Sequence, residues 1–340
     1  MAATAPTGLD IGSMSIRAVQ AGRAKDGPVV AHAGQVPSPP GAVHSGVIHD
    51  DKAVTLALKR LWADGGFRGR RVVLGVTNPQ VVVREMTVAN VPARELRNSL
   101  PFQVRDSLPL PVERSLLDFH PLETPGRGET VRGLLIAAPK EAVLTAVRAV
   151  ERAGLHVVRV DLASFALLRA ASRTDGQVEA IVDIGARSTS VVVHADGEPL
   201  IVRTIPRGGT EITETVAGRL GVAAAEAESR KCLVGLRPDG DPETVSAVRD
   251  AAGPLVNEIR SSFAYLTAGG RQARVSRLAL SGGGALLPGL PEALGTDLGV
   301  ETIIADPTLR LRRGHRAGAD PRDTLGPSAA VSIGLALGAA

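Results

Sequence analysis

Residues 180 to 193 read AIVDIGARSTSVVV, an apolar segment interrupted by one aspartate, one glycine and a cluster of hydroxyl side chains. A carboxylate at the end of a buried strand is costly unless it is hydrogen-bonded, paired or facing a metal. The chain repeats this arrangement near its N-terminus, in TGLDIGSMSIRAV, residues 7 to 19. The shared spacing gives Asp10, Gly12 and Ser15, then Asp183, Gly185 and Ser188. The repeat predicts two related strand–turn–strand units, one in each half of the chain.

The residue types of the repeat suit a metal–phosphate complex. A glycine after the aspartate permits a tight turn whose backbone N–H groups can bind an anion, and Ser15, Ser188, Thr189 and Ser190 add hydroxyl donors. Two such turns facing each other across a cleft would hold phosphates from both sides, and the two aspartates would hold a hydrated Mg²⁺. A single copy would more often be an ordinary turn. Two copies in the same strand context favour a ligand-binding function over an ordinary turn.

A third motif, LALSGGGALLPG, places Gly282, Gly283 and Gly284 between an expected strand and an expected helix. Backbone can approach a ligand closely at such a loop, and a helix N-terminus favours anions. A dinucleotide-binding loop fits poorly because Leu287 stands where a third glycine should be, and no GxxxxGK[ST] motif occurs. A glycine turn made for close strand–helix packing remains an equal alternative.

Composition excludes several classes of protein. Aromatic residues make up 2% of the 340 residues, which argues against base-stacking surfaces for single-stranded nucleic acid. The net charge is only +4, and the arginines are scattered singly, so we expect no nucleic-acid partner. Cys232 is the one cysteine, which excludes an internal disulfide.

The sequence also carries no signal for membrane insertion. MAATAPTGLD lacks the basic and apolar regions of a signal peptide. No stretch approaches the roughly 18 apolar residues that a transmembrane helix needs. We therefore expect a cytoplasmic protein that reaches the inner face of the cell membrane only through a partner.

Periodicity and turn signals predict an α/β architecture. In the first half we expect a hairpin, a third strand, a helix capped by Asp50 or Asp51, and a strand pair from VVLGV and VVVREMTV. Pro101 is expected to interrupt the next helix. From Val178 the pattern restarts with a hairpin, a helix capped by Thr210, and a long helix over 241–268. A strand, the glycine loop and a final buried helix follow.

Together these motifs resemble the actin-like ATPase superfamily, with its two phosphate motifs and its adenosine motif. Within it, the chain resembles the PilM family of type IV pilus assembly proteins, which is related to the division protein FtsA. The further segments that carry the resemblance are PPGAVHSGVIHD, SLPLPVERSLLDFHPLE, VDLASFALL, AESRKCLVG and LGPSAAVSIGLALG. The resemblance runs from about residue 7 to the C-terminus.

The resemblance implies a bilobed fold of duplicated ribonuclease H-like domains with an inserted small α/β subdomain of the SHS2 type. The first lobe would comprise residues 7–83 and 158–176, and the inserted subdomain residues 84–157. The second lobe would comprise residues 177–208 and 275–340, and a helical subdomain residues 209–274.

The resemblance also implies a nucleotide site for ATP and Mg²⁺. Glu228 and Lys231 match the helix beside the adenine and ribose, although by spacing alone they are equally an i, i+3 surface pair. Asp10 and Asp183 would contact the metal, through water. The full implied set is Asp10, Gly12, Ser13, Ser15, Asp183, Gly185, Ser188, Thr189, Gly208, Gly209, Glu228, Lys231, Gly282, Gly283, Gly284 and Leu286.

The function implied is an ATP-binding scaffold that recruits pilus inner-membrane components through the N-terminal peptide of a PilN-like protein. Other pilus and motor components, and self-association, are further implied partners. No residue stands out as a general base for water attack, so we expect at most slow ATP hydrolysis. The alternatives are a sugar or acid kinase of the same superfamily and an FtsA-like filament protein.

Overall fold

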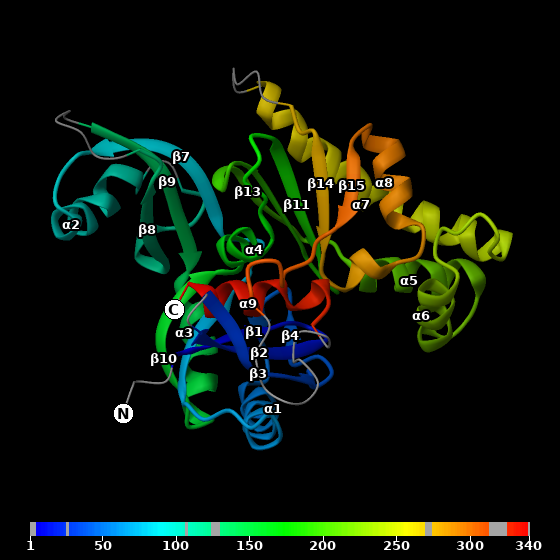
Figure 1. Cartoon of the computed structure of the whole chain (residues 1–340), viewed down its shortest axis with the longest axis horizontal. Coiled ribbons are helices and arrows are strands. Elements are labelled where there is room, and N and C mark those ends of the chain that lie inside the picture. Colours follow the sequence, from blue (N-terminus) through cyan, green and yellow to red (C-terminus); the bar gives the residue numbers. More distant parts are fainter. Residues whose placement is uncertain are drawn as a thin grey trace.

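The computed structural model describes residues 5–24, 27–105, 108–123, 130–268, 274–312 and 325–338. Two five-stranded sheets form its framework (Figure 1). The first has the order β10-β6-β1-β2-β3 and comprises β1 (Thr7–Ile11), β2 (Ser15–Ala24), β3 (Gly27–Pro37), β6 (Arg71–Val76) and β10 (His156–Leu162). The second has the order β13-β12-β11-β14-β15 and comprises β11 (Val178–Ile184), β12 (Thr189–Ala195), β13 (Glu198–Ile205), β14 (Arg277–Ser281) and β15 (Glu301–Ile304).

The two sheets have the same connectivity. β1 pairs antiparallel with β2 and parallel with β6, as β11 pairs antiparallel with β12 and parallel with β14. The outer strands correspond as well, because β3 and β13 are antiparallel to their neighbours whereas β10 and β15 are parallel to theirs. The repeated motif therefore marks a duplicated lobe, and the predicted bilobed α/β fold is confirmed.

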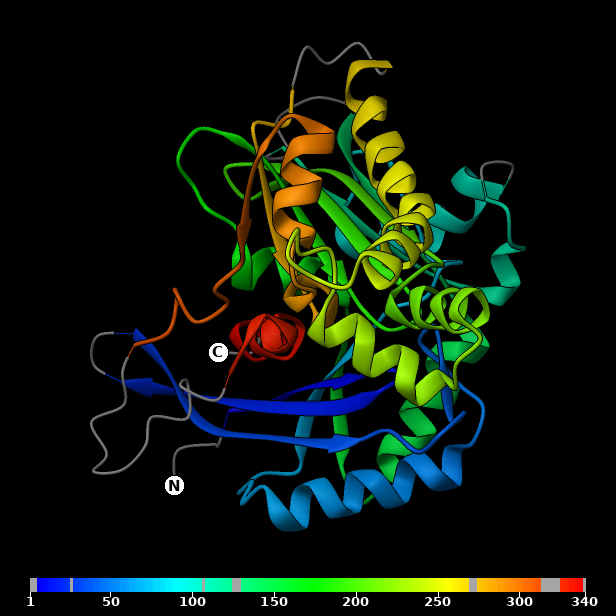
Figure 2. The same ribbon diagram turned by 90° about the vertical axis from the view of Figure 1, so that its right-hand side faces the viewer.

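Helices α4 (Ala163–Ala171) and α9 (Ala330–Leu337) lie between the two sheets (Figure 2). Their buried residues pack with residues from both sheets, so this layer holds the lobes together. The two helices touch backbone to backbone, because a Cβ added to Gly334 would lie 1.8 Å from the carbonyl oxygen of Ala166. The buried C-terminal helix predicted from the sequence is confirmed.

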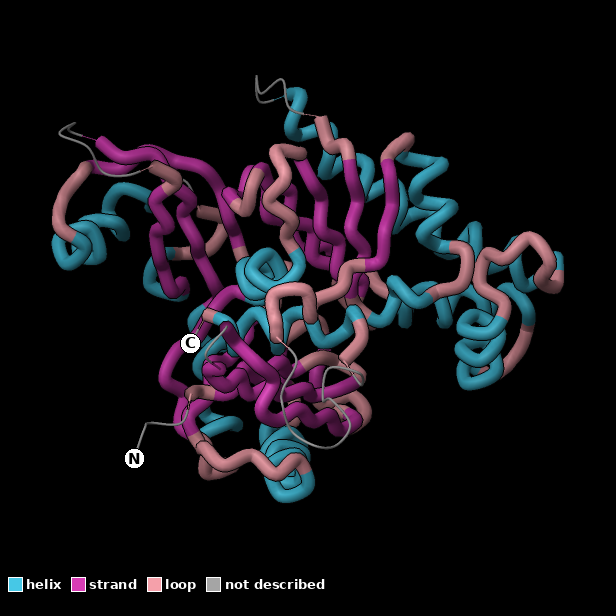
Figure 3. The backbone as a smooth tube through the Cα atoms, viewed as in Figure 1, coloured by secondary structure: helices cyan, strands magenta, loops and turns pink. Residues whose placement is uncertain are grey.

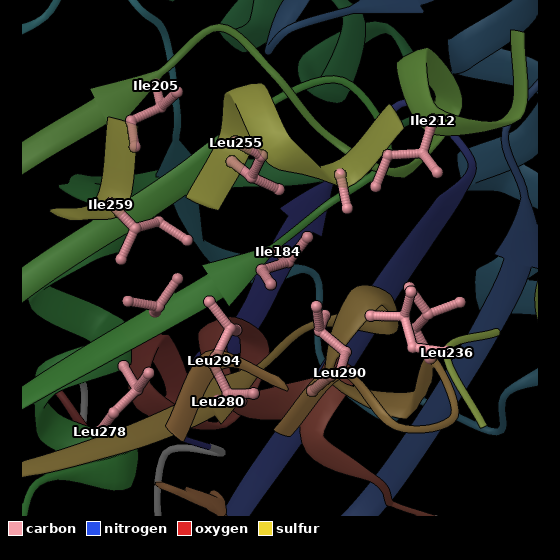
Figure 4. Close-up of a cluster of buried hydrophobic side chains, with 14 of the residues drawn as sticks. Ile184, Ile205, Ile212, Leu236, Leu255, Ile259, Leu278, Leu280, Leu290 and Leu294 are labelled. Atoms are coloured by element: carbon pink, nitrogen blue, oxygen red, sulfur yellow. The ribbon is translucent and has the colours of Figure 1, made fainter. Parts of the chain in front are cut away.

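The outer face of the second sheet is covered by α5 (Gly209–Leu220), α6 (Ala224–Leu233), α7 (Pro242–Ala268) and α8 (Leu290–Leu298). Both faces of β11 are thus buried, which explains why Ala180, Ile181, Val182 and Ile184 are all apolar. Ile184 packs in the outer core among Leu255, Leu290 and Leu294 (Figure 4), whereas Ile181 faces the layer between the sheets.

The outer face of the first sheet is covered by α1 (Asp51–Asp64) and α3 (Lys140–Arg152). Asp50 caps α1, as predicted, because its carboxylate accepts a hydrogen bond from the backbone N–H of Ala53 at 2.9 Å. Between β3 and α1 lies a short hairpin of β4 (Val43–His44) and β5 (Val47–Ile48).

A separate three-stranded sheet, of order β7-β9-β8, extends to one side of the two main sheets (Figure 3). The unit built on this sheet comprises β7 (Val82–Ala89), α2 (Ala93–Val104), the 3₁₀ turn η2 (Val112–Arg114), β8 (Ser115–Pro121) and β9 (Thr130–Pro139). It has its own small hydrophobic core. Helix α3, expected inside the subdomain 84–157, shares its core with α1 instead. We therefore propose to limit the inserted subdomain to residues 82–139, and the division into four domains stays a prediction.

Three local predictions are wrong. β6 and β7 do not pair, because β6 is an inner strand between β1 and β10 whereas β7 pairs with β9. Helix α2 continues through Pro101, where proline removes only one intrahelical donor. Thr210 does not cap α5, which begins at Gly209 with no side-chain cap. Within the described residues, no helix is long and apolar enough to cross a membrane.

The contact between α9 and α4 predicts a position-specific loss of stability. Gly334→Ala should lower the free energy of unfolding by about 1–3 kcal/mol, because the new methyl group overpacks a backbone contact. Gly218→Ala is the matched control, since a Cβ there would meet nothing within 4 Å. Because Gly218 is exposed within α5, its replacement by alanine should instead raise the free energy of unfolding by about 0.5–1 kcal/mol. Urea unfolding measures both, and a Gly334→Ala protein as stable as the wild type would contradict the contact.

Candidate functional site

The β1–β2 and β11–β12 turns have the same geometry. The N–H of Gly12 donates to the carbonyl of Ser15 at 3.0 Å, and the N–H of Gly185 donates to the carbonyl of Ser188 at 3.0 Å. A Cβ on either glycine would lie 3.0 Å or 2.9 Å from the same carbonyl, so each turn closes tightly around its glycine. The repeated sequence therefore folds into a repeated turn.

Both turns line one cavity of about 790 Å³. Its walls come from the two lobes, from α5, α6 and α7, from the glycine loop and from the segment that precedes α9. The cavity brings together most of the residues predicted for a nucleotide site: Asp10, Gly12, Ser13, Ser15, Asp183, Gly185, Ser188, Gly209, Glu228, Lys231, Gly282, Gly283, Gly284 and Leu286.

Thr189 and Gly208 are the two predicted residues that do not line this cavity. The Thr189 hydroxyl is fully buried and donates to the carbonyl of Arg207 at 2.8 Å. Gly208 lies against the β11–β12 turn, where a Cβ would come within 2.4 Å of the carbonyl oxygen of Gly185. The next N–H, that of Gly209, donates to this same oxygen at 2.9 Å. Gly208 thus packs behind the turn, and the Thr189 hydroxyl is engaged within the protein.

The two repeated aspartates form an electrostatically strained pair. Burial, and then the charge of Asp10, raise the pKa of Asp183 to about 6. Burial also raises the pKa of Asp10, although Arg17 on β2 partly offsets this. Like charges in a buried site are disfavoured unless a cation lies near them. The pair therefore has the chemistry of a site for a divalent cation.

The donors at this position fit Mg²⁺ in particular. Within the described ranges, no group of three or more His, Cys, Asp or Glu side chains converges to hold a metal ion. Mg²⁺ commonly binds through one or two carboxylates and takes its remaining ligands from water and phosphate oxygens. Asp10 and Asp183 are the two carboxylates at this cavity that could serve in this way.

Glu228 and Lys231 pair at the edge of the cavity, with Lys231 buried and the Glu228 side chain 51% exposed. The Lys231 side chain is 9% exposed, and its Nζ donates to Glu228 Oε2 at 2.7 Å, to Thr213 Oγ1 at 2.7 Å and to the Gly209 carbonyl at 3.0 Å. Burial alone would raise the pKa of Glu228, but the hydrogen bonds from Lys231 and Thr213 outweigh it and lower that pKa. The pair joins α6 to α5 at the cavity wall.

The glycine loop serves both packing and access. Gly282 has φ of +79°, and a Cβ on it would lie 2.5 Å from the Ile184 carbonyl oxygen. A Cβ on Gly284 would lie 2.3 Å from Ile184 Cγ2. These two glycines let the 3₁₀ turn η3 (Gly283–Leu286) pack against the end of β11. Gly283 instead faces open space, and Leu286 is 60% exposed where it lines the cavity.

Sequence reasoning missed a contact between the lobes. The Ser45 hydroxyl, in the β4–β5 turn of the first lobe, donates to the carbonyl of Arg187 in the β11–β12 turn at 3.1 Å. Ser45 has φ of +46°, which is uncommon for a residue other than glycine. The only sequence signal was the Ser45-Gly46 turn itself, which gives no sign of its distant partner.

The pKa of Asp183 predicts a pH dependence for the protein without metal and nucleotide. The folded protein keeps this proton up to about pH 6, whereas the unfolded chain releases it near 3.8. Because the folded state binds more protons in this window, the Asp183 contribution to stability falls as pH rises. Asp183→Asn removes the effect. The free energy of unfolding of Asp183→Asn, relative to that of the wild type, should therefore rise by on the order of 2–3 kcal/mol between about pH 4 and 6 and then level off. Denaturant unfolding across this range tests it, and a constant difference would contradict the raised pKa.

Solved structures show which proteins share this arrangement. A structure of the PilM–PilN type IV pilus biogenesis complex contains a similar chain, with 29% identity, a TM-score of 0.86 and coverage of 98% of both chains. MreB 5 of Spiroplasma citri bound to AMPPNP has a TM-score of 0.60 at 12% identity, covering 98% of this chain and 95% of that one. At that identity the likeness to MreB 5 shows the fold alone.

Sequence comparisons point to the same group. The cell division protein FtsA of Bacillus subtilis is 25% identical over 253 residues, which span 67% of this chain and 57% of FtsA. The match thus spans little more than half of that relative's length. The family model described as type IV pilus assembly protein PilM matches residues 8–340. With nearly the whole chain matched, and with two actin-like lobes around one cavity, the chain belongs to the PilM family of type IV pilus assembly proteins.

Proposed function

We propose that this PilM-family chain binds Mg-ATP in the cavity between its lobes and serves as a cytoplasmic scaffold for inner-membrane pilus components. The observation that carries the nucleotide proposal is the pair of identical turns that line one cavity with their aspartates. MreB 5 of Spiroplasma citri, which shares the fold, was solved bound to AMPPNP, and this supports a nucleotide as the ligand of this chain. Family membership favours the pilus interpretation over the kinase alternative.

Different groups of the cavity would bind different parts of Mg-ATP. The N–H groups of the two turns would hold phosphate oxygens, and Asp10 and Asp183 would hold Mg²⁺ through water. When bound, the metal would neutralise phosphate charge and relieve the repulsion between the two carboxylates. Glu228 and Lys231, fixed to each other on α6, would contact the ribose and adenine, and the glycine loop would cover the adenosine.

Hydrolysis should be slow. The described side chains that line the cavity include no histidine, and Glu228 is engaged by Lys231 and Thr213. A general base must reach the attacking water with a free lone pair. The cavity is therefore better suited to holding a nucleotide than to turning it over rapidly.

The resemblance implies a groove for the PilN-like peptide in the insert, residues 84–157, and we propose that the peptide lies where this insert adjoins the free edge of the first sheet. Among the described residues, β10 pairs only with β6, so its other side is an open edge. Val158 and Val160 on this strand are 36% and 40% exposed. The inserted subdomain lies close by, because His120 of β8 and Phe165 of α4 are in ring contact with centroids 5.7 Å apart. An extended peptide could add main-chain pairing to this edge and anchor apolar side chains on the valines.

The solved PilM–PilN complex supports a PilN-like partner for this chain. Through that partner the protein would be held at the inner face of the cell membrane. Other pilus and motor components, and self-association, remain further proposals of the same interpretation.

The nucleotide proposal predicts a stabilisation that needs both aspartates. At a ligand concentration of about 100 times Kd, Mg-ATP should stabilise the wild type by about 2.7 kcal/mol, which corresponds to several degrees in Tm. Asp10→Ala and Asp183→Ala should each lose most of this shift, because each removes one side of the metal site. Asp297→Ala, at the exposed end of α8, is the control and should keep it. If both cavity variants melt with the full Mg-ATP shift, the proposal is wrong.

The peptide proposal predicts that a charge on β10 blocks the partner. Val160→Lys should weaken binding of the partner's cytoplasmic N-terminal peptide by roughly tenfold or more, because a buried apolar anchor of this size contributes about 1.5–3 kcal/mol. Leu56→Lys on α1, where the side chain is 67% exposed, is a matched control that should bind normally. Fluorescence anisotropy with a labelled peptide measures both. Equal affinity in the two variants would place the peptide elsewhere.

A further inference from the structure

A second, small cavity of about 20 Å³ is lined by Asp10 but by no residue of the β11–β12 turn. It is bounded by the end of β1, the loop after β6 and helix α3. Four residues line both this small cavity and the large one: Asp10, Ile11, Gly46 and Thr77. Asp10 thus stands in the partition between the two spaces.

Asn78 brings an unused donor to the small cavity. The residue is 2% exposed and lines the cavity, and its Oδ1 accepts a hydrogen bond from the N–H of Gln80 at 2.8 Å. Its Nδ2 is buried and has no hydrogen-bond partner within the described part of the protein. A buried amide donor is almost always satisfied in folded proteins, by protein or by ordered water.

The cavity and its lining suit one water molecule. About 10–15 Å³ is the minimum volume for a water, which also needs two to four polar partners. Besides Asn78, the acidic residue Asp10 lines the same space. Gly46 and Thr77, which line both cavities, pack closely, since a Cβ on Gly46 would lie 1.5 Å from the Thr77 carbonyl oxygen.

We propose that the small cavity holds one ordered water that accepts a hydrogen bond from Asn78 Nδ2 and donates one to the Asp10 carboxylate. Asn78 is thereby a positioning residue, which acts through the water to hold Asp10 oriented toward the metal and phosphates. The positioning role rests on the proposed nucleotide binding, whereas the water itself does not.

A high-resolution crystal structure of the nucleotide-free protein tests the water directly. We expect density for one water at about 2.7–3.2 Å from both Asn78 Nδ2 and an Asp10 oxygen. An empty cavity, or an Asn78 amide bonded directly to a protein oxygen, overturns the proposal.

Calorimetric titration with ADP, in Mg²⁺ and in EDTA, tests the positioning role. Asn78→Ala removes the whole amide, whereas Asn78→Ser keeps a weaker acceptor for the Gln80 N–H but lacks the donor. Both should weaken Mg-ADP binding by about 10–100-fold, as loss of an outer partner of a metal ligand does, and should leave metal-free ADP binding unchanged. Asn257→Ala on the exposed face of α7 is the control. Normal Mg-ADP affinity in Asn78→Ser, or equal losses with and without metal, overturns the role.

A double-mutant cycle separates action through Asp10 from a general effect. In an Asp10→Ala background, adding Asn78→Ala should cost no further Mg-ADP affinity, because the group that it positions is gone. The same loss in both backgrounds would overturn the inference. If the wild type binds no nucleotide under either condition, the proposed function and the positioning role both fail, and the crystal density still decides the water.

Discussion

The backbone contact between α4 and α9 is the constraint on which the arrangement of the lobes depends. Gly334 allows the two helices to touch. On the other side of α9, a Cβ on Gly8 of β1 would lie 2.2 Å from the Ser332 carbonyl oxygen. A shared layer this thin fixes the separation of the sheets. The turns that follow β1 and β11 both line the single large cavity.

Strand β11 carries a carboxylate near each end, and the two differ in what surrounds them. Glu179 is fully buried, yet its pKa is lowered, because hydrogen bonds from His194, the Arg173 N–H and Arg277 outweigh the effect of burial. Asp183, at the opposite end, has a raised pKa and another acid beside it. The hydrogen bonds on Glu179 therefore outweigh its burial, whereas the hydrogen bond that Asp183 accepts from Ser281 does not. The contrast is the one expected between a carboxylate with a structural role and one that faces a ligand site.

Much of this could be predicted from sequence because it rests on local repetition. The DIGxxS spacing predicted two equivalent turns, and the apolar periodicity predicted most strands and helices. The errors arose where a neighbour distant in the chain decides the outcome. β6 and β7 are close in sequence, but β6 finds its partners in β1 and β10. Glu228 and Lys231 have the spacing of a surface pair, yet Lys231 is buried and donates hydrogen bonds to Thr213 and to the Gly209 carbonyl. Neither the Ser45–Arg187 contact nor the Asn78 Nδ2, which lacks a partner among the described residues, has a local signature.

The Ser45–Arg187 hydrogen bond has a kinetic consequence. It joins a loop of the first lobe to the β11–β12 turn of the second, beside the cavity. Any motion that moves these two turns apart must first break it. A single bond of this kind contributes only about 0.5–1.5 kcal/mol, too little to lock the lobes but enough to slow their separation several-fold. It therefore opposes separation of the two turns, and so of the cavity walls to which they belong.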